Sequence, residues 1–420
     1  MNKPHHPLSN FIPRECEPWI EEMAGVCPIM SIMGPRQAGK TRLIKQYFSH
    51  LPYYDFEDTQ TQALVRKDVI GFVRENINGA IFDEFQNIPE ITRALKVVAD
   101  EIIYDYAEYQ KGSIDARFIL SGSHNYVTTG QKYESMVGRA SIIELPPMTA
   151  SELGEINAET LMFKGGYPAL HQGKKEDPAK FFPRYIITYL QREIRDVHNI
   201  TDLSKFEDFM QMCANRVGNI LNHDMMASDL GLPVETVGGW LSILEASYII
   251  FRARPYYNNF EKCLVKRPKI YFYDTGLAAH LLGVKNPQSI ADMGLKGKLF
   301  ENLVVSEVKK TFLNKGLLAD SVYFWNAEKQ GSDDPYEIDM VLVGRYGLKT
   351  IEIKASDKLN PHWFNPLKKL SELTKTEKFI IYNGPTVETQ DGKALNFKDL
   401  AQIFIDTPII DPRHERLDED

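Results

Sequence analysis

A glycine-rich stretch near the start of the chain, GPRQAGKT, has the residue types and spacing that cradle phosphates. Gly34, Gly39, Lys40 and Thr41 match the pattern GxxxxGK[ST] and stand between an apolar strand pattern and an amphipathic helix pattern, as that motif requires. The glycines let backbone N–H groups turn toward the phosphates, Lys40 reaches the β and γ oxygens, and the Thr41 hydroxyl ligates Mg²⁺. The predicted phosphate-binding residues are Gly34, Pro35, Arg36, Gln37, Ala38, Gly39, Lys40, Thr41 and Arg42.

An acidic motif follows further along the chain, where the apolar run of AIFDE ends in two carboxylates. Phosphoryl transfer uses one carboxylate in the Mg²⁺ shell and another to orient or deprotonate the attacking water. We expect Asp83 to take the first role and Glu84, as a catalytic residue beside Lys40, to take the second. An acidic turn at a strand end is the alternative, and the joint presence of both motifs argues against it.

Two more polar residues are candidates for sensing the γ-phosphate. Ser123 lies at the end of the apolar run ARFILSGS, although a Ser-Gly-Ser turn also occurs for its own sake. Arg139 is a candidate catalytic arginine finger, because a guanidinium offers bidentate contact to transition-state charge. A plain surface arginine stays open as the alternative.

A second group of charged residues lies in EIDMVLVGRYGLKTIEIK, which predicts a β-hairpin turning at residues 344–347. If Gly344 pairs with Gly347, Asp339 lies opposite Glu352 on one face, with Cβ atoms about 5 Å apart. Like charges in that position are destabilising, and a divalent cation or a raised carboxyl pKa relieves the repulsion.

This hairpin allows two interpretations. In the first, Asp339 and Glu352 bind Mg²⁺, Lys354 is a catalytic residue that steadies the attacking water or the developing charge, and Glu301 adds a carboxylate from the helix pattern KGKLFENLVVSEV. In the second, Lys354 forms a cross-strand ion pair with Glu337 on a solvated surface. Both stay open from the sequence.

Composition limits the classes of protein to consider. The chain has 420 residues and a formal net charge of −8, so any nucleic-acid contact must come from a local basic patch. The four cysteines show no metal-binding spacing, and no apolar run approaches the roughly 20 residues that span a bilayer. We expect a cytoplasmic protein without membrane contact.

The pattern of apolar residues, and with it the predicted secondary structure, changes twice along the chain. Apolar strands alternate with helix patterns in the first third, which predicts a parallel α/β sheet with strands within 27–33, 52–56, 79–85 and 116–123. Mostly helical patterns follow to about residue 265, and a helix with alternating strands follows after about residue 295.

The middle region has the order of a helix-turn-helix with a wing. MMASDLGLPVETVGGWLSILEASYIIFRARPYY (225–257) predicts a short helix, a turn, a longer helix with Val237, Trp240, Leu241 and Leu244 inward, and a strand pair. The segment 252–269 carries five net positive charges with interleaved aromatic residues, which would suit DNA or RNA. The longer helix has no Lys or Arg, so a role in packing or in oligomer contacts is equally open.

Several motifs taken together resemble a known family. FIPRECEPWIEEM, GPRQAGKTRL, FDEFQNIPE, ILSGSHNY, VGRASIIELPPMTASEL and GGYP, in this order, are similar to the prokaryotic AAA-type P-loop ATPases that carry a C-terminal domain of uncharacterised function. The resemblance implies ATP and Mg²⁺ as cofactors, and a homo-oligomer in which a neighbour supplies an arginine. The chain departs from the family at Arg42, where a small hydroxyl residue is more usual.

The C-terminal residues resemble a second family. Glu301, Asp339, Glu352 and Lys354, on helix, strand and strand, are similar to the PD-(D/E)xK nuclease fold. The implied fold class is α/β: a P-loop parallel sheet with flanking helices, then a helical winged-helix region, then an α/β nuclease-like domain with a β-hairpin core. The expected domains are 1–148 (ATPase), 149–204 (helical lid or linker), 205–270 (winged-helix-like), 271–410 (nuclease-like) and 411–420 (charged tail).

Two functions from different classes follow. The first is an ATPase that is coupled to nucleic-acid processing by a Mg²⁺-dependent nuclease. The second is an ATP-driven switch or DNA-binding regulator whose nuclease-like domain binds without cleaving.

Overall fold

The computed structural model describes residues 11–109, 115–123, 136, 138–172, 176–190, 202–256, 267–317, 322–327, 336–344 and 347–404. The chain divides into two compact units. The first unit comprises Met1–Met148 with the short segments Ala246–Tyr248 and Leu313–Gly316, and the second comprises the rest of the chain. Among the described helices, none combines the length and apolar character needed to cross a membrane.

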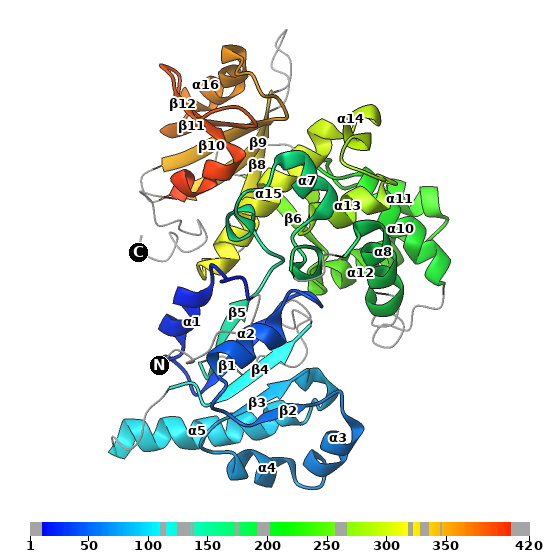
Figure 1. Cartoon of the computed structure of the whole chain (residues 1–420). Helices are drawn as coiled ribbons and strands as arrows, with labels where there is room; N and C mark the ends of the chain where they lie inside the picture. Colours follow the sequence, from blue (N-terminus) through cyan, green and yellow to red (C-terminus); the bar gives the residue numbers. More distant parts are fainter. Residues whose placement is uncertain are drawn as a thin grey trace. The chain divides into compact units, whose positions relative to one another are not determined.

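The first unit is built on a five-stranded sheet with the order β2-β3-β4-β1-β5 (Figure 1). Its strands are β1 (Ile29–Met33), β2 (Tyr53–Asp55), β3 (Ala80–Asp83), β4 (Phe118–Gly122) and β5 (Ala140–Glu144). Every neighbouring pair is parallel. The carboxyl ends of the strands therefore share one edge, which is where ligands bind in open parallel sheets.

The four strands predicted in this unit are confirmed, while β5 was missed. β5 is an edge strand with one wet face: Ile143 is fully buried, whereas Ile142 is 42% exposed. Its short apolar run also merges with the Pro-rich stretch that follows, which hid the strand signal. The central strands were easier to recognise because β1 and β4 are buried on both faces.

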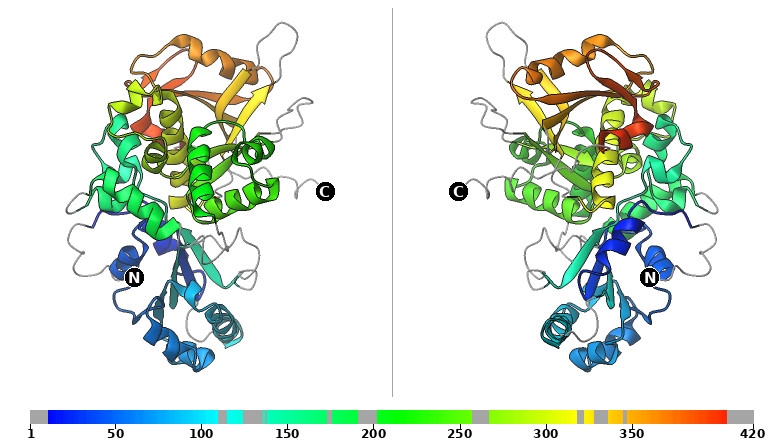
Figure 2. Two further views of the ribbon diagram at one scale, coloured as in Figure 1. Left: turned by 90° about the vertical axis from the view of Figure 1, so that its right-hand side faces the viewer. Right: turned by 90° about the vertical axis from the view of Figure 1, so that its left-hand side faces the viewer.

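Helices cover both faces of this sheet (Figure 2). On one face Ile20 of α1 (Glu17–Met23) and Leu43 and Ile44 of α2 (Lys40–Tyr47) pack against the sheet in one hydrophobic cluster. On the other face the ring of Phe72 packs on Phe82. The remaining helices of the unit are α3 (Thr59–Val65), α4 (Val69–Glu75), the 3-10 turn η1 (Phe85–Asn87) and α5 (Ile91–Tyr109).

The second unit begins with helices whose starts are marked by side-chain caps. Thr149 and Glu152 form a capping box at α6, and Asn157 and Asn222 cap α7 and α11. The helices are α6 (Ala150–Leu153), α7 (Ala158–Lys164), η3 (Pro168–Leu170), α8 (Pro178–Tyr185), η4 (Ile186–Leu190), α10 (Leu203–Asn215), α11 (His223–Leu230), α12 (Val234–Ala246), α13 (Thr275–Leu281) and α14 (Ser289–Asp292).

An eight-stranded mixed sheet follows, with the order β12-β13-β11-β10-β9-β8-β6-β7. The strand bounds are β6 (Ile250–Pro255), β7 (Lys269–Phe272), β8 (Val322–Ala327), β9 (Tyr336–Gly344), β10 (Gly347–Lys354), β11 (Thr376–Tyr382), β12 (Val387–Glu388) and β13 (Lys393–Asn396). β6 pairs antiparallel with β7 and parallel with β8. The strand pair expected as a wing therefore belongs to the same sheet as the C-terminal hairpin.

Three helical segments cover this sheet: α15 (Lys296–Asn314), η5 with α16 (Pro361–Phe364 and Asn365–Ser371), and η6 (Phe397–Phe404). Leu367 and Leu370 of α16 join a hydrophobic cluster with Val341 and Ile380 of the sheet. On α15, the Phe300 ring meets Phe397 of η6 edge to face. The second of these contacts packs the helix that carries Glu301 against η6.

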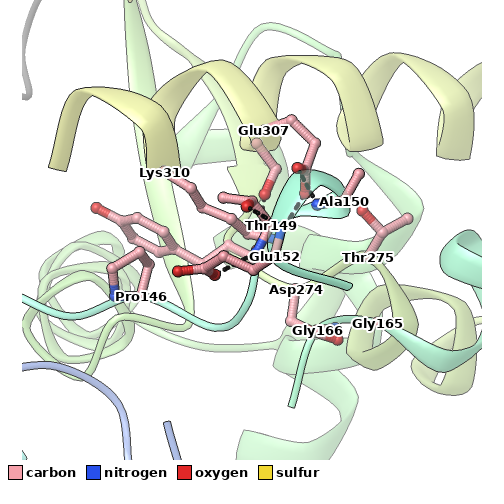
Figure 3. A network of polar contacts seen from close by, with 12 residues as sticks. Pro146, Thr149, Ala150, Glu152, Gly165, Gly166, Asp274, Thr275, Glu307 and Lys310 are labelled. Atoms are coloured by element: carbon pink, nitrogen blue, oxygen red, sulfur yellow. Dashed lines mark hydrogen bonds and ion pairs between the residues drawn. The ribbon is translucent and has the colours of Figure 1, made fainter. Parts of the chain in front are cut away.

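A buried polar contact joins the start of α13 to the turn that follows α7 within the second unit (Figure 3). Asp274, only 1% exposed, accepts hydrogen bonds from the backbone N–H groups of Gly166 (2.7 Å) and Leu277 (2.9 Å). Gly165 has φ +69°, and a Cβ at this position would lie 2.0 Å from Asp274 Oδ1. The GGYP motif is thus explained by close packing around a buried carboxylate.

We expect Gly165→Ala to destabilise the second unit more than Gly154→Ala does. Both glycines end helices with positive φ, but a Cβ at Gly154 meets nothing within 4 Å. Backbone strain alone should cost about 1–3 kcal/mol at either position, and the clash with Asp274 should add roughly 2 kcal/mol at Gly165. Urea unfolding followed by tryptophan fluorescence measures both variants, and equal losses would contradict this account.

Candidate functional site

The phosphate loop leaves β1 and leads directly into α2, as the sequence predicted. Gly34 has φ +153°, and a Cβ there would lie 2.1 Å from the carbonyl oxygen of Leu145. Gly39 has φ +100° and stands at the N-cap of α2. Only glycine fits both positions, one for contact with a neighbouring backbone and the other for the left-handed turn into the helix.

Lys40 lies inside the loop. Its ammonium donates hydrogen bonds to the carbonyl oxygens of Gly34 at 2.8 Å and Pro35 at 3.0 Å, and the residue is 5% exposed. Arg36, further along the loop, forms an ion pair with Glu57 at 3.2 Å. The remaining predicted loop residues, Gln37, Ala38 and Arg42, lie between or directly after these groups.

Asp83 and Thr41 meet at the carboxyl edge of the sheet. The Thr41 hydroxyl donates to Asp83 Oδ2 at 2.9 Å, and the Tyr53 hydroxyl donates to the same oxygen at 2.6 Å. A hydroxyl and a carboxylate beside the phosphate loop are the oxygen ligands that suit Mg²⁺. The oxygen atoms of Thr41 and Asp83 therefore fit the Mg²⁺ ion that the sequence implies.

Glu84 adopts a left-handed backbone conformation with φ +51°, which is rare for a residue with a side chain. Burial raises the pKa of its carboxyl, and the positive charges of Lys40 and Arg36 act in the opposite direction. The amide of Gln86 donates to Glu84 and also lies 3.3 Å from the hydroxyl of Ser123. Glu84 and Ser123 are thus brought together through one side chain.

Arg139 does not reach the nucleotide edge of its own chain. It precedes β5, at the amino end of the parallel strands, and pairs with Asp100 of α5. The phosphate loop stands at the opposite, carboxyl end of the neighbouring strand β1. The prediction that Arg139 senses the phosphate is therefore wrong for the site of the same chain, because β5 and its place in the sheet were not predicted from the sequence.

Arg14 was not recognised as part of the site from the sequence. Its guanidinium is buried and donates to the carbonyl oxygens of Ala38 in the phosphate loop (2.9 Å) and of Pro146 after β5 (2.7 Å). It therefore holds the loop against the end of the neighbouring strand. The only sequence signal was its place before an amphipathic helix, which says nothing about such distant partners.

The second group of charged residues gathers in the second unit, between one helix and three strands. Glu301 comes from α15, Glu337 and Asp339 from β9, Glu352 and Lys354 from β10, and Lys269 and Tyr271 from β7. The predicted hairpin register is confirmed from Gly347 with Gly344 to Ile351 with Met340. Beyond that pair the ladder opens, and Ile353 N–H donates to Asp339 Oδ2 at 2.7 Å. Asp339 and Glu352 therefore lie at the open end of a central strand pair.

The predicted surface ion pair between Lys354 and Glu337 is wrong. Lys354 contacts Glu352 and lies 3.9 Å from Asp339, whereas Glu337 pairs with Lys269. β10 is also a central strand, flanked by β9 and β11, and is buried along most of its length. The edge strand β7, which the hairpin pattern could not reveal, supplies the actual partner of Glu337.

Burial and mutual repulsion raise the pKa values of the carboxyl groups in this cluster. The pKa of Glu301 rises to about 7 and that of Glu352 to about 8, and burial is the largest cause for both. Burial also raises the pKa of Asp339, against the lowering effect of Lys354. Glu352 Oε2 is buried and has no hydrogen-bond partner among the described atoms. A divalent cation would satisfy this oxygen, and carboxylate oxygens are the type of ligand that Mg²⁺ prefers.

The carboxylates do not already converge on one point. Within the described residues, no three acidic, histidine or cysteine side chains are grouped closely enough to share an ion. The ammonium groups of Lys269 and Lys354 each lie within 4 Å of two carboxylates. Cation binding would therefore rearrange side chains around Glu352.

The order expected for a helix-turn-helix with a wing is present in α11, α12, β6 and β7. Val237, Trp240, Leu241 and Leu244 are buried as predicted. Much of the basic segment, residues 257–266, lies outside the described residues. At its described ends, Arg252 pairs with Glu245, and Lys269 is only 2% exposed, so neither presents a free charge for phosphates.

We expect Arg14→Met to weaken ATP binding about 5- to 100-fold, because two buried carbonyl groups lose their donor and the loop loses its support. Arg74→Met is the matched control, since Arg74 is an exposed arginine in an ion pair with Glu101. Titration with a fluorescent ATP analogue measures both. Unchanged affinity in a folded Arg14→Met protein would show that the loop does not depend on this contact.

The raised carboxyl pKa values predict that the metal-free protein loses stability as pH rises. A carboxyl whose folded pKa exceeds its unfolded value near 4.3 favours the folded state at low pH and loses that contribution as pH passes the folded value. For Glu301 and Glu352 the window runs from about 4.5 to about 8. Melting temperatures in EDTA should fall across this range, and Glu352→Gln should reduce the fall by several degrees. The exposed Glu377→Gln is the control, and an identical fall in all three proteins would refute the prediction.

Three family models match successive parts of the chain. Residues 27–154 match the AAA domain, residues 156–288 match a domain of unknown function (DUF8612), and residues 296–400 match another domain of unknown function (DUF4143). Uncharacterized proteins of Mycobacterium bovis and Mycobacterium tuberculosis are each 26% identical over 311 residues, which cover 74% of this chain and 67% of theirs.

The solved structures that are similar to this chain include a Walker-type ATPase of Pyrococcus abyssi. It is 13% identical, with a TM-score of 0.42, and the match covers 66% of this chain and 99% of that one. The family match over residues 27–154 agrees with the geometry of the phosphate loop, Asp83 and Glu84. Together they support an AAA-type P-loop ATPase domain in the N-terminal part of the chain.

Proposed function

We propose that the protein hydrolyses ATP with Mg²⁺ in its first unit and cleaves nucleic-acid phosphodiester bonds with Mg²⁺ at the carboxylate cluster of its second unit. The observation that supports ATP hydrolysis is the 2.9 Å contact between Thr41 Oγ1 and Asp83 Oδ2. This contact brings both expected Mg²⁺ ligands together beside the phosphate loop that Lys40 occupies.

In this function the residues of the first unit divide the work of phosphoryl transfer. Lys40 neutralises the β and γ oxygens, and Thr41 and Asp83 hold Mg²⁺. Glu84 orients the attacking water and accepts a proton from that water. Burial raises the pKa of the Glu84 carboxyl toward neutral pH, and a general base works best when its pKa is close to the working pH. The Gln86 amide keeps the Glu84 carboxylate next to Ser123.

A different observation supports phosphodiester cleavage: Glu352 Oε2 is buried and has no hydrogen-bond partner among the described atoms. Mg²⁺, when bound, polarises the phosphate and lowers the pKa of a bound water. Asp339 and Glu352 would hold the ion. Lys354, beside both carboxylates, would stabilise the charge that develops on the phosphate oxygens.

The nucleic acid would approach along the winged-helix-like region. β6 and β7 continue into the sheet of the carboxylate cluster through the pairing of β6 with β8, so a strand bound along the wing would lie on the sheet that carries the cluster. α12 contains no Lys or Arg, and its exposed positions include Glu235. We therefore propose contact with phosphates through the exposed Arg254 of β6, and not insertion of α12 into a groove.

A non-cleaving interaction module is the second candidate for the second unit. It is favoured by the carboxylates' present pairing with lysines, since no three of them converge on one ion in the part of the chain that is described. In that case the unit would bind nucleic acid or protein under the control of the ATPase.

Wild type, Lys40→Ala and Asp339→Asn test this function as full-length proteins. Each is incubated with single- and double-stranded DNA and RNA, with Mg²⁺ or Mn²⁺, and with or without ATP. We expect Lys40→Ala to lose at least about 100-fold in ATP turnover, and Asp339→Asn to lose nucleic-acid cleavage while ATP turnover remains.

Two exposed positions supply the controls, Lys67→Ala for the phosphate loop and Asp292→Asn for the cluster. ATP turnover that survives Lys40→Ala overturns the ATPase assignment. Cleavage that survives Asp339→Asn overturns the nuclease assignment, and nucleic-acid binding without products in any protein favours the interaction module.

A further inference from the structure

Lys269 is a buried cation that the nuclease-like sequence pattern does not contain. It is 2% exposed, comes from β7, and its ammonium pairs with Glu337 and lies 3.8 Å from Glu301 Oε1. Its Nζ also lies 5.3 Å from the centre of the Phe324 ring. A lysine so far from water is stable only with such compensation, so it belongs to the cluster by its electrostatics.

The two sides of the cluster differ in how well their oxygens are satisfied. Glu301 Oε1 accepts a hydrogen bond from the Tyr271 hydroxyl at 2.7 Å in addition to the nearby ammonium of Lys269. The backbone of Gly218 lies close to the Glu301 carboxylate on this side, since a Cβ at Gly218 would lie only 3.0 Å from it. Glu352 Oε2, on the other side, has no partner among the described atoms. Among the described buried oxygens of the cluster, the one that lacks a partner therefore lies on the side of Asp339 and Glu352.

The formal charge of the cluster indicates how many divalent cations it can bind. When all of its described carboxyl groups are ionised, as cation binding requires, the cluster has four carboxylates and two ammonium groups and a formal charge of −2 (−4 + 2): Glu301, Glu337, Asp339 and Glu352 against Lys269 and Lys354. One divalent cation neutralises this charge. A second would leave an excess of +2 around the buried ammonium of Lys269, which is unfavourable.

We propose that the ammonium of Lys269 takes the place of a second divalent cation, so that the cluster binds one Mg²⁺, at Asp339 and Glu352. This inference rests on the proposed Mg²⁺ site of the second unit. Lys269 is then a positioning residue: it holds Glu301 and Glu337 away from the ion and fixes the stoichiometry of the site. Glu301 becomes the partner of Lys269 and not a metal ligand.

Manganese binding to the full-length protein, followed by electron paramagnetic resonance without nucleotide, tests this stoichiometry. We expect Asp339→Asn to bind one ion fewer per chain than wild type, and Lys269→Met to bind one ion more. Lys269→Arg keeps the positive charge and should match wild type. Lys393→Met, which removes an exposed lysine paired with Glu388, is the control. A wild-type count for a folded Lys269→Met protein overturns the proposal.

Glu301→Gln gives an answer even if Lys269→Met fails to fold. Because Glu301 binds Lys269 and not the ion, this variant should keep the wild-type count, with a manganese affinity changed less than about threefold. Loss of the ion in Glu301→Gln overturns the proposal. If Asp339→Asn loses no ion, the Mg²⁺ site of the proposed function fails and the inference fails with it. If Asp339→Asn loses one ion and Lys269→Met gains none, only the role of Lys269 fails.

Discussion

A carboxylate that is removed from water must receive hydrogen bonds or positive charge, and this requirement shapes both units of the protein. In the first unit, Asp83 is 4% exposed and accepts two hydroxyl hydrogen bonds, from Thr41 and Tyr53. In the second, Asp274 accepts backbone N–H groups, and Glu307 accepts the N–H of Ala150 (Figure 3). Residues that look unrelated along the chain are thus explained by the acids they compensate.

The compensation differs between structural and functional acids. Asp274 is surrounded by glycines and backbone donors that hold it in one place, and a Cβ at Gly165 would collide with it. Glu352 is compensated less completely, because one of its buried oxygens has no partner among the described atoms. Incomplete compensation at a buried acid is typical of sites that bind an ion or move a proton.

The sheet of the second unit joins two regions that the sequence separated. The wing strands β6 and β7 and the hairpin β9 and β10 lie in one sheet because β6 pairs with β8. Lys269 reaches Glu337 and Glu301 only because of this pairing. A residue counted as part of a nucleic-acid-binding surface is therefore a member of the carboxylate cluster.

The sequence alone determined what depends on near neighbours in the chain: the strand, loop and helix around Lys40, four of the five strands of the first sheet, and the hairpin register from Gly344 with Gly347 to Met340 with Ile351. Side chains on one face recur every two residues in a strand and every three or four residues in a helix. The local backbone sets this repeat, so the amino-acid sequence reveals it. Tertiary structure alone decided that Arg139 lies at the far end of the sheet from the phosphates, that Arg14 supports the loop, and that Lys269 replaces Lys354 as the partner of Glu337. These outcomes depend on which distant strands become neighbours, and burial of the whole sheet fixes that order, not the residues beside each charge.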